Sequence, residues 1–104
     1  MRVQTNETKE IRLVRIAEEK ETYYRNAMDK FKGYCVACYP MDSIFGVTVH
    51  EVKSRGQHPN DWWTIPDNGC PLCVTHHDYV HNLSTKEAEE FCRLHMEKAM
   101  RGIM

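Results

Sequence analysis

The chain has 104 residues, 41% of them hydrophobic and 28% charged, and its 14 Lys and Arg residues face 15 Asp and Glu residues, for a formal net charge of −1. This length allows one domain with a modest core and excludes a two-domain enzyme with a deep cleft between its lobes. A membrane-spanning protein is also excluded, because no apolar run approaches the roughly 18 to 20 residues that cross a bilayer. The charge balance means that any surface that binds nucleic acid must be local.

Cysteine and histidine usage indicates metal binding. The five Cys residues include two C-x-x-C pairs, Cys35 with Cys38 and Cys70 with Cys73. The N-terminus lacks the apolar stretch of a secretory signal, so we expect a cytoplasmic protein whose thiols bind metal instead of forming disulfides. All six His residues lie at or beyond His50. This combination is typical of a chain that binds metal through Cys and His.

A helix is predicted over residues 7–32. Thr5, Asn6 and Thr8 are available as N-caps, and Gly33 lies where a glycine commonly ends a helix. The apolar residues of this segment recur at spacings of three, four and seven, so they form a stripe along one face. They are Ile11, Val14, Ala17, Tyr24, Ala27, Met28 and Phe31.

The next segments are predicted to be two short strands and a loop. Residues 34–39 form the first strand, which holds the first Cys pair in a tight knuckle. Residues 45–52 form the second strand, which is rich in β-branched side chains. Residues 54–69 are a loop by composition, with two prolines and two glycines.

Two helices are predicted at the end of the chain. A short one covers residues 72–81, and a longer one begins at a capping box from Ser84 to Glu87 and ends at Gly102. The predicted class is α+β, with one domain over residues 1–104 made of an N-terminal helix (7–32), a core (34–82) and a C-terminal helix (84–102). A core this small gains stability from a bound metal.

Two ligand pairs far apart in a chain are typical of a tetrahedral zinc ribbon. Cys35 and Cys38 supply the first pair. The second pair is open: Cys70 with Cys73 gives four thiolates, the set that bare spacing favours, whereas Cys73 with His76 gives three thiolates and one imidazole. Both sets are closed, so the zinc is expected to be structural.

A second group of histidines lies on the predicted short helix. His77 and His81 are four residues apart, so they stack on one helix face and can hold one metal from the same side. His76 points about a quarter-turn away and stays available for zinc. One short helix can therefore serve two metals.

These ordered residues resemble the HNH endonuclease family, in particular its small zinc-ribbon members from phages and prophages. The resemblance covers residues 35–81 and combines the first Cys pair, the run His50-Glu51-Val52-Lys53-Ser54-Arg55-Gly56, Asn68-Gly69, and the segment Leu72 to His81. The interval of nine residues from Asn68 to His77, then four to His81, matches colicin-type nucleases, in which both histidines bind the catalytic metal.

The resemblance implies a ββα-metal (His-Me finger) core with a structural zinc ribbon. It implies a DNA endonuclease that hydrolyses phosphodiester bonds, with Mg²⁺ or Mn²⁺ held by His77 and His81 as the catalytic cation. Asn68 would clamp the loop between strand and helix, and His76 is favoured over Cys70 as the fourth zinc ligand. A lone site of this type cuts one strand at a time, so the enzyme would be a nickase unless two sites act together.

The residues of the second predicted strand allow two registers, because the family presents a metal ligand followed by a histidine base. If the pair is Val49-His50, His50 is the base and Glu51 replaces the missing ligand. If it is His50-Glu51, His50 binds the metal and Glu51 is the base. Imidazole chemistry favours the first register, which we prefer, while the Lys-Ser-Arg-Gly continuation favours the second. Lys53 and Arg55 are placed to bind phosphates.

Two other functions fit the Cys pairs: a non-catalytic zinc-ribbon module that binds nucleic acid, and a protein-interaction domain stapled by zinc. Neither accounts for the ordered His and Asn residues. We expect DNA as the partner, no membrane, and either a monomer or a homodimer. For the remaining candidates we expect structural roles: Trp62 and Trp63 pack the long loop, Cys92 is a core residue, and His58 and His95 have no metal partner.

Overall fold

The computed structural model of the protein describes residues 8–43 and 46–104. Within them the elements are α1 (Lys9–Lys30), β1 (Val47–Glu51), β2 (Gly69–Cys73), α2 (Val74–His81) and α3 (Thr85–Ile103). The predicted α+β class is confirmed. The candidate caps Thr5 and Asn6, the first residue of the predicted helix 7–32 and the first residue of the predicted strand 45–52 lie outside the described residues.

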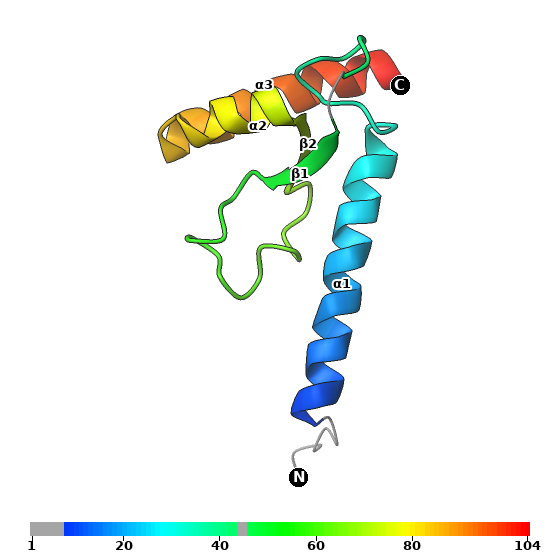
Figure 1. Ribbon diagram of the computed structural model, residues 1–104, viewed down its shortest axis with the longest axis vertical. Helices are drawn as coiled ribbons and strands as arrows, with labels where there is room; N and C mark the ends of the chain where they lie inside the picture. Colours follow the sequence, from blue (N-terminus) through cyan, green and yellow to red (C-terminus); the bar gives the residue numbers. More distant parts are fainter. Residues whose placement is uncertain (1–7, 44–45) are drawn as a thin grey trace.

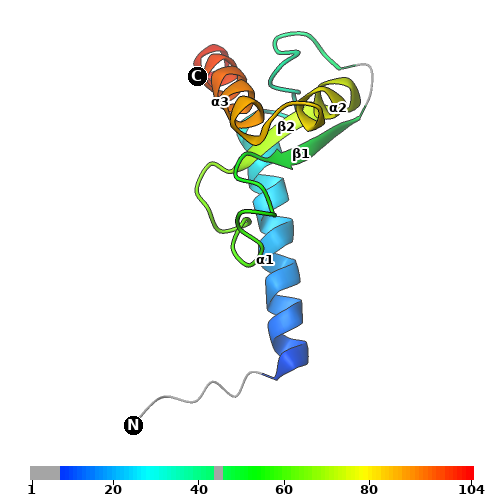
Figure 2. The ribbon, with the colours of Figure 1, turned by 90° about the vertical axis from the view of Figure 1, so that its left-hand side faces the viewer.

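The helices diverge from a small sheet. Figure 1 shows α1 as a long arm whose C-terminal end meets the sheet, while α2 and α3 run side by side in another direction. Strand β2 contacts both α1 and α2. The long connection between β1 and β2 lies along the middle of α1 in both ribbon views (Figures 1 and 2). None of the helices in the described part of the chain is long and apolar enough to cross a membrane.

Helix α1 begins and ends where the sequence predicts. The Thr8 side-chain oxygen accepts a hydrogen bond from the Ile11 N–H at 3.1 Å, as an N-cap does. At the other end Gly33 has φ +79°, a conformation that suits glycine, and its N–H bonds to the Met28 carbonyl at 2.8 Å. These two caps define a helix of 22 residues.

The predicted apolar stripe on α1 is only partly buried. Ala27 and Phe31 pack against the domain together with Tyr23, but Ile11 and Val14 are 55% and 58% exposed. These two lie on the first turns of the arm, which no described segment covers (Figure 1). The spacing of apolar residues identifies the helix, but it does not tell how much of the helix the rest of the domain covers.

Strands β1 and β2 form an antiparallel pair, with Val47 opposite Cys73 and His50 opposite Cys70. One backbone bond, from the Val36 N–H to the Pro71 carbonyl at 3.0 Å, joins the first Cys turn to β2. The turn after α1 therefore bonds to the edge of β2 that does not pair with β1.

Strand β2 differs from the sequence prediction, which has a loop at residue 69 and a helix at residues 72–73. All five residues of β2 are buried, so the strand shows no alternation of apolar and polar side chains. Glycine and proline are also poor strand formers. Pro71 is tolerated because each strand of a two-stranded sheet is an edge strand.

The predicted strand at 34–39 is also wrong, because this segment forms tight turns. The N–H groups of Cys38 and Tyr39 both bond to the Cys35 carbonyl, at 3.1 and 2.9 Å. Backbone groups that a sheet ladder needs are thus used within the segment itself. The expected knuckle around the first Cys pair is present, but without a strand.

Helix α3 closes the core and starts at the predicted capping box. The Glu87 N–H donates to the Ser84 hydroxyl at 3.1 Å, and the Ser84 N–H donates to the Glu87 carboxylate at 3.4 Å. The buried face of α3 joins residues from β2, from α2 and from the segments that follow α1 and β1. The core consists of Phe31, Cys35, Val36, Val52, Cys70, Leu72, Cys73, Val80, Cys92, Met96 and Ala99.

Gly69 allows α1 to pack closely on β2. A Cβ added at Gly69 would lie 2.6 Å from the Ala27 Cβ and 3.1 Å from the Val49 Cγ1. We expect Gly69→Ala to lower the free energy of unfolding by about 1–3 kcal/mol, the usual cost of overpacking. A Cβ at Gly46 meets nothing within 4 Å, so Gly46→Ala is the matched control and should change stability by less than about 0.5 kcal/mol. Urea unfolding of the zinc-loaded proteins measures both, and equal stabilities would contradict this packing.

Candidate metal centres

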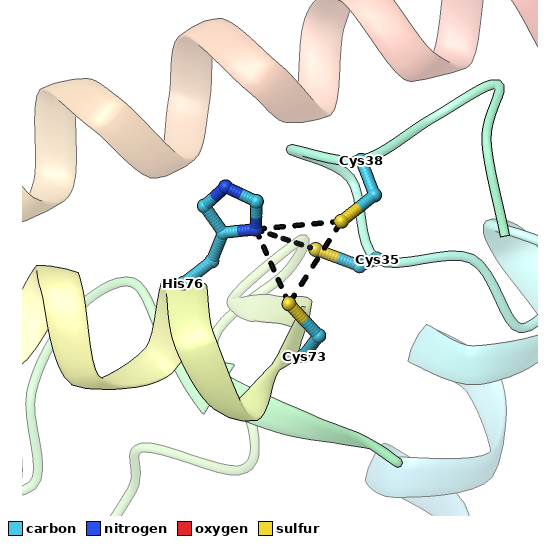
Figure 3. A group of neighbouring side chains, drawn as sticks. All are labelled: Cys35, Cys38, Cys73 and His76. Carbon is cyan, nitrogen blue, oxygen red and sulfur yellow. Dashed lines mark hydrogen bonds between the residues drawn. The ribbon is translucent and has the colours of Figure 1, made fainter. Parts of the chain in front are cut away.

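Four metal-ligating side chains from distant parts of the chain meet in one group, which we call the Cys3His group. Cys35 and Cys38 come from the turn after α1, Cys73 is the last residue of β2, and His76 lies in the first turn of α2 (Figure 3). Figure 3 shows the three sulfur atoms and the His76 ring pointing toward one another. Such a group can hold a metal such as zinc.

The distances in the Cys3His group match the edges of a tetrahedron around zinc. The His76 Nδ1 lies 3.5 Å from the Sγ of both Cys35 and Cys38 and 3.2 Å from the Cys73 Sγ, and the Sγ atoms of Cys38 and Cys73 are 3.8 Å apart. Bonds of about 2.3 Å to sulfur and about 2.0 Å to nitrogen give tetrahedral edges of about 3.8 Å between sulfurs and about 3.5 Å between sulfur and nitrogen. The four ligands therefore fit zinc and leave no open position.

Cys70 does not belong to the Cys3His group. It is fully buried on β2 and contacts Cys92 on α3. The hydrogen bond with the Cys92 thiol, followed by burial, raises the pKa of the Cys70 thiol far above its usual value, so it stays protonated. This geometry confirms the preference for His76 over Cys70 and contradicts the four-thiolate set that bare spacing favours. The expected core role of Cys92 is confirmed.

The start of α2 favours a thiolate at Cys73, which is the N-cap residue of this helix. Burial raises the pKa of the Cys73 thiol, but hydrogen bonds from the His76 N–H, from the thiols of Cys38 and Cys35, and from the Thr75 N–H outweigh it. The resulting pKa lies below its usual value. Because zinc binds the thiolate, the helix N-terminus prepares this ligand for the metal.

Three histidines form a second group, the three-histidine group. His50 on β1 and His77 and His81 on α2 each bring a ring nitrogen within 4.8 Å of the others. The ring centroids of His77 and His81 are 4.5 Å apart, and that of His50 lies 5.5 and 5.7 Å from them. The rings line an open cleft of about 490 Å³. The pairing of His77 and His81 across one helical turn is present as the sequence predicts.

Burial and mutual repulsion favour the uncharged forms of His50 and His77 in the three-histidine group. The pKa of His50 is lowered to about 4, first by burial and then by the neighbouring charges of His77 and His81. The pKa of His77 is also lowered, by burial and then by His81. At neutral pH both imidazoles are therefore neutral and offer a nitrogen lone pair. Converging neutral imidazoles are suited to a divalent cation.

Glu51 lies beside the three-histidine group without belonging to it. Its carboxylate accepts a hydrogen bond from the Arg55 Nε at 2.5 Å, and its side chain is 12% exposed. Among the described residues, the structure brings His50 to the two helix histidines and leaves Glu51 out of their ligand group. Glu51 still lines the same cleft. This placement favours the register in which His50 is the ligand.

Asn68 ties together the loop that connects β1 and β2. This side chain is 2% exposed, and its Nδ2 donates to the carbonyls of Lys53 and Trp62 at 3.1 and 2.9 Å. Its Oδ1 accepts from the Lys53 N–H at 2.6 Å. The sequence places this clamp between strand and helix, but the structure has it between the two strands because β2 follows directly. Tyr23 donates to the Asn68 carbonyl at 3.1 Å from 45 residues away, a contact without a sequence signal.

The two predicted phosphate ligands both have carboxylate partners. The Lys53 Nζ lies 2.7 Å from the Glu89 carboxylate of α3, and Arg55 pairs with Glu51. Lys53 is not among the residues that line the cleft, whereas Arg55 is. Both cationic side chains are therefore already paired with a carboxylate of the protein.

Trp62 has the packing role that the sequence predicts, and His58 and His95 contact other side chains of the protein. Trp62 is 4% exposed, and its ring packs at 5.3 Å from that of Tyr23, so the tryptophan holds the loop onto α1. His58 pairs with Asp61 at 3.3 Å. The His95 ring packs 4.4 Å from that of Phe91 and belongs to neither metal group.

No family model, curated protein or solved structure matches the chain. The fold and the Cys3His group define a small α+β protein that can bind a metal such as zinc. A more specific function has to be argued from the residues of the two metal groups.

The Cys3His group makes a direct prediction about zinc. Cys73→Ser should lose the metal and unfold much of the domain, because zinc at such sites contributes roughly 10–16 kcal/mol that is also folding free energy. Cys70→Ala should keep one zinc per chain and lose only about 1–2 kcal/mol of stability. Elemental analysis after desalting and circular dichroism measure both. Zinc loss in Cys70→Ala, or retention in Cys73→Ser, would contradict the ligand set.

Proposed function

We propose that the protein is a metal-dependent DNA endonuclease of the HNH type, which hydrolyses phosphodiester bonds at the cleft of the three-histidine group. One observation carries the proposal: three histidines that the HNH resemblance singles out, from two different elements, converge in an open cleft. A non-catalytic zinc ribbon would not account for the three-histidine group. The Asn68 clamp fixes the loop that starts at the edge of the cleft.

The two metal groups differ in the way that structural and catalytic sites differ. The Cys3His group offers a complete set of four ligands, whereas the three-histidine group offers three and has an exposed member, His81. Room remains there for a water molecule and a phosphate oxygen. A cation bound at this site neutralises charge that develops on the phosphate and stabilises the leaving oxygen.

The ligand set bears on the choice of cation. Mg²⁺ prefers oxygen ligands and keeps much of its water, whereas imidazole nitrogen suits transition metals better. Divalent transition metals also bind nitrogen sites with affinities that rise from Mn²⁺ to Ni²⁺. We therefore expect Mn²⁺ or Ni²⁺ to support cleavage at lower concentration than Mg²⁺.

The proposed function predicts metal-dependent cleavage of DNA. Zinc-loaded protein with Mn²⁺ should nick supercoiled plasmid DNA, and EDTA should stop the reaction. His77→Ala removes one ligand and should slow nicking at least about 100-fold, the upper range for weakened metal sites. His58→Ala, in a loop outside both metal groups, is the matched control and should cut normally. If wild type and His77→Ala behave alike, the endonuclease proposal is wrong.

A separate experiment tests whether His50 is a metal ligand or the base. Because its ring joins those of His77 and His81, His50→Ala should weaken Mn²⁺ binding at least about tenfold. Titration calorimetry on zinc-loaded protein measures this affinity without any cleavage assay. Loss of cleavage with unchanged Mn²⁺ affinity would instead make His50 the base, as the other register requires.

A further inference from the structure

Arg55 is held by three contacts although 57% of its side chain is exposed. Its Nε donates to the Glu51 carboxylate at 2.5 Å, and its Nη2 donates to the Tyr24 hydroxyl at 2.9 Å. Its guanidinium lies 4.2 Å from the centre of a Trp62 ring. A carboxylate, a hydroxyl and an aromatic face together restrain the planar guanidinium in one orientation. Arg55 thus connects the end of β1 with α1 and with the loop.

These contacts limit what Arg55 can offer to DNA. An arginine that binds phosphate uses its nitrogens as a fork toward two oxygens. Here Nε and Nη2 already donate to groups of the protein itself. Displacing them would leave the Glu51 carboxylate, which is largely buried, without its positive partner. The arrangement is therefore better suited to fixing Glu51 than to gripping a phosphate.

Glu51 is the group whose position depends on Arg55. It follows His50 directly and lines the cleft of the three-histidine group. Arg55 takes one carboxylate oxygen, Oε1, while Oε2 accepts no hydrogen bond from the described residues. Tyr24 and Trp62 keep Arg55 in place, and Arg55 in turn holds the Glu51 side chain, which lines the cleft.

We propose that Arg55 is a positioning residue that holds the Glu51 carboxylate at the edge of the three-histidine cleft, so that Glu51 accepts a proton from the attacking water. This inference rests on the proposed endonuclease function with His50 as a metal ligand. In the reaction the water oxygen bonds to phosphorus and the bond from phosphorus to the leaving ester oxygen breaks. The water proton passes to Glu51, and the leaving oxygen takes a proton from solvent.

The test compares kcat, KM and salt dependence for cleavage of an oligonucleotide duplex with Mn²⁺. Arg55→Ala should lower kcat about tenfold or more, because it disturbs a proton acceptor, and should leave KM within about twofold. Tyr24→Phe removes only one contact of Arg55 and should lower kcat by a smaller factor. Arg101→Ala removes an exposed arginine with the same kind of i,i+4 carboxylate partner on α3 and should cut normally.

A double variant separates positioning from a general loss of structure. Glu51→Gln should lower kcat about 10²–10⁴-fold, as removal of a general base does. The double variant Glu51→Gln with Arg55→Ala should be no slower than Glu51→Gln alone, because Arg55 then has no base to position. Zinc content and Mn²⁺ affinity should be unchanged in all variants. A misfolded variant would lose both zinc and Mn²⁺ affinity. In the double variant, the loss of kcat would then be the product of the losses in the two single variants.

The failures are distinguishable. If wild type does not cut with any cation, the proposed function is wrong and this inference falls with it. If wild type cuts but Arg55→Ala raises KM, keeps kcat and reduces the salt slope by about 1, Arg55 is a phosphate ligand and only this inference is wrong. Normal cleavage by Glu51→Gln, or additive defects in the double variant, would overturn it as well.

Discussion

Four ligands tie the turn after α1 to the first turn of α2 at distances that suit zinc. The sheet between these segments has only two strands, and such a sheet is marginal in water by itself. Zinc binding of about 10–16 kcal/mol compares with roughly 5–15 kcal/mol for the whole stability of a typical domain. A zinc ion held by these four ligands would therefore decide whether the segments around the sheet stay together.

Helix α2 links the two metal groups because adjacent residues serve different ones. His76 points to the cysteines, while His77 lies about 100° further around the helix and joins His50 and His81. Fixing Cys73 and His76 fixes the position and rotation of an eight-residue helix. The antiparallel register, with His50 opposite Cys70, then brings the third imidazole to the same place. The residues of the Cys3His group thus determine the geometry of the three-histidine group without contributing a ligand to it.

The sequence predicted the features that depend on local chemistry and missed those that depend on context. Helix caps at Thr8 and Ser84, the first Cys pair and the spacing of His77 and His81 follow from rules over a few residues. Strand β2 was missed because burial on both faces removes the alternation by which strands are recognised. The partners of Arg55 come from α1 and the loop, and no spacing along the chain reports such contacts.

Under the proposed function, the positive charge that attracts DNA does not come from unpaired side chains among the described residues of the cleft. Lys53 and Arg55 are neutralised by Glu89 and Glu51, and the imidazole of His50 is uncharged at neutral pH. A cation in the three-histidine group adds two positive charges where a phosphate would lie. Under the proposed function, the bound cation and DNA each strengthen the binding of the other. Under the proposed function, a chain with a net charge of −1 can therefore act on a polyanion when the cation is bound.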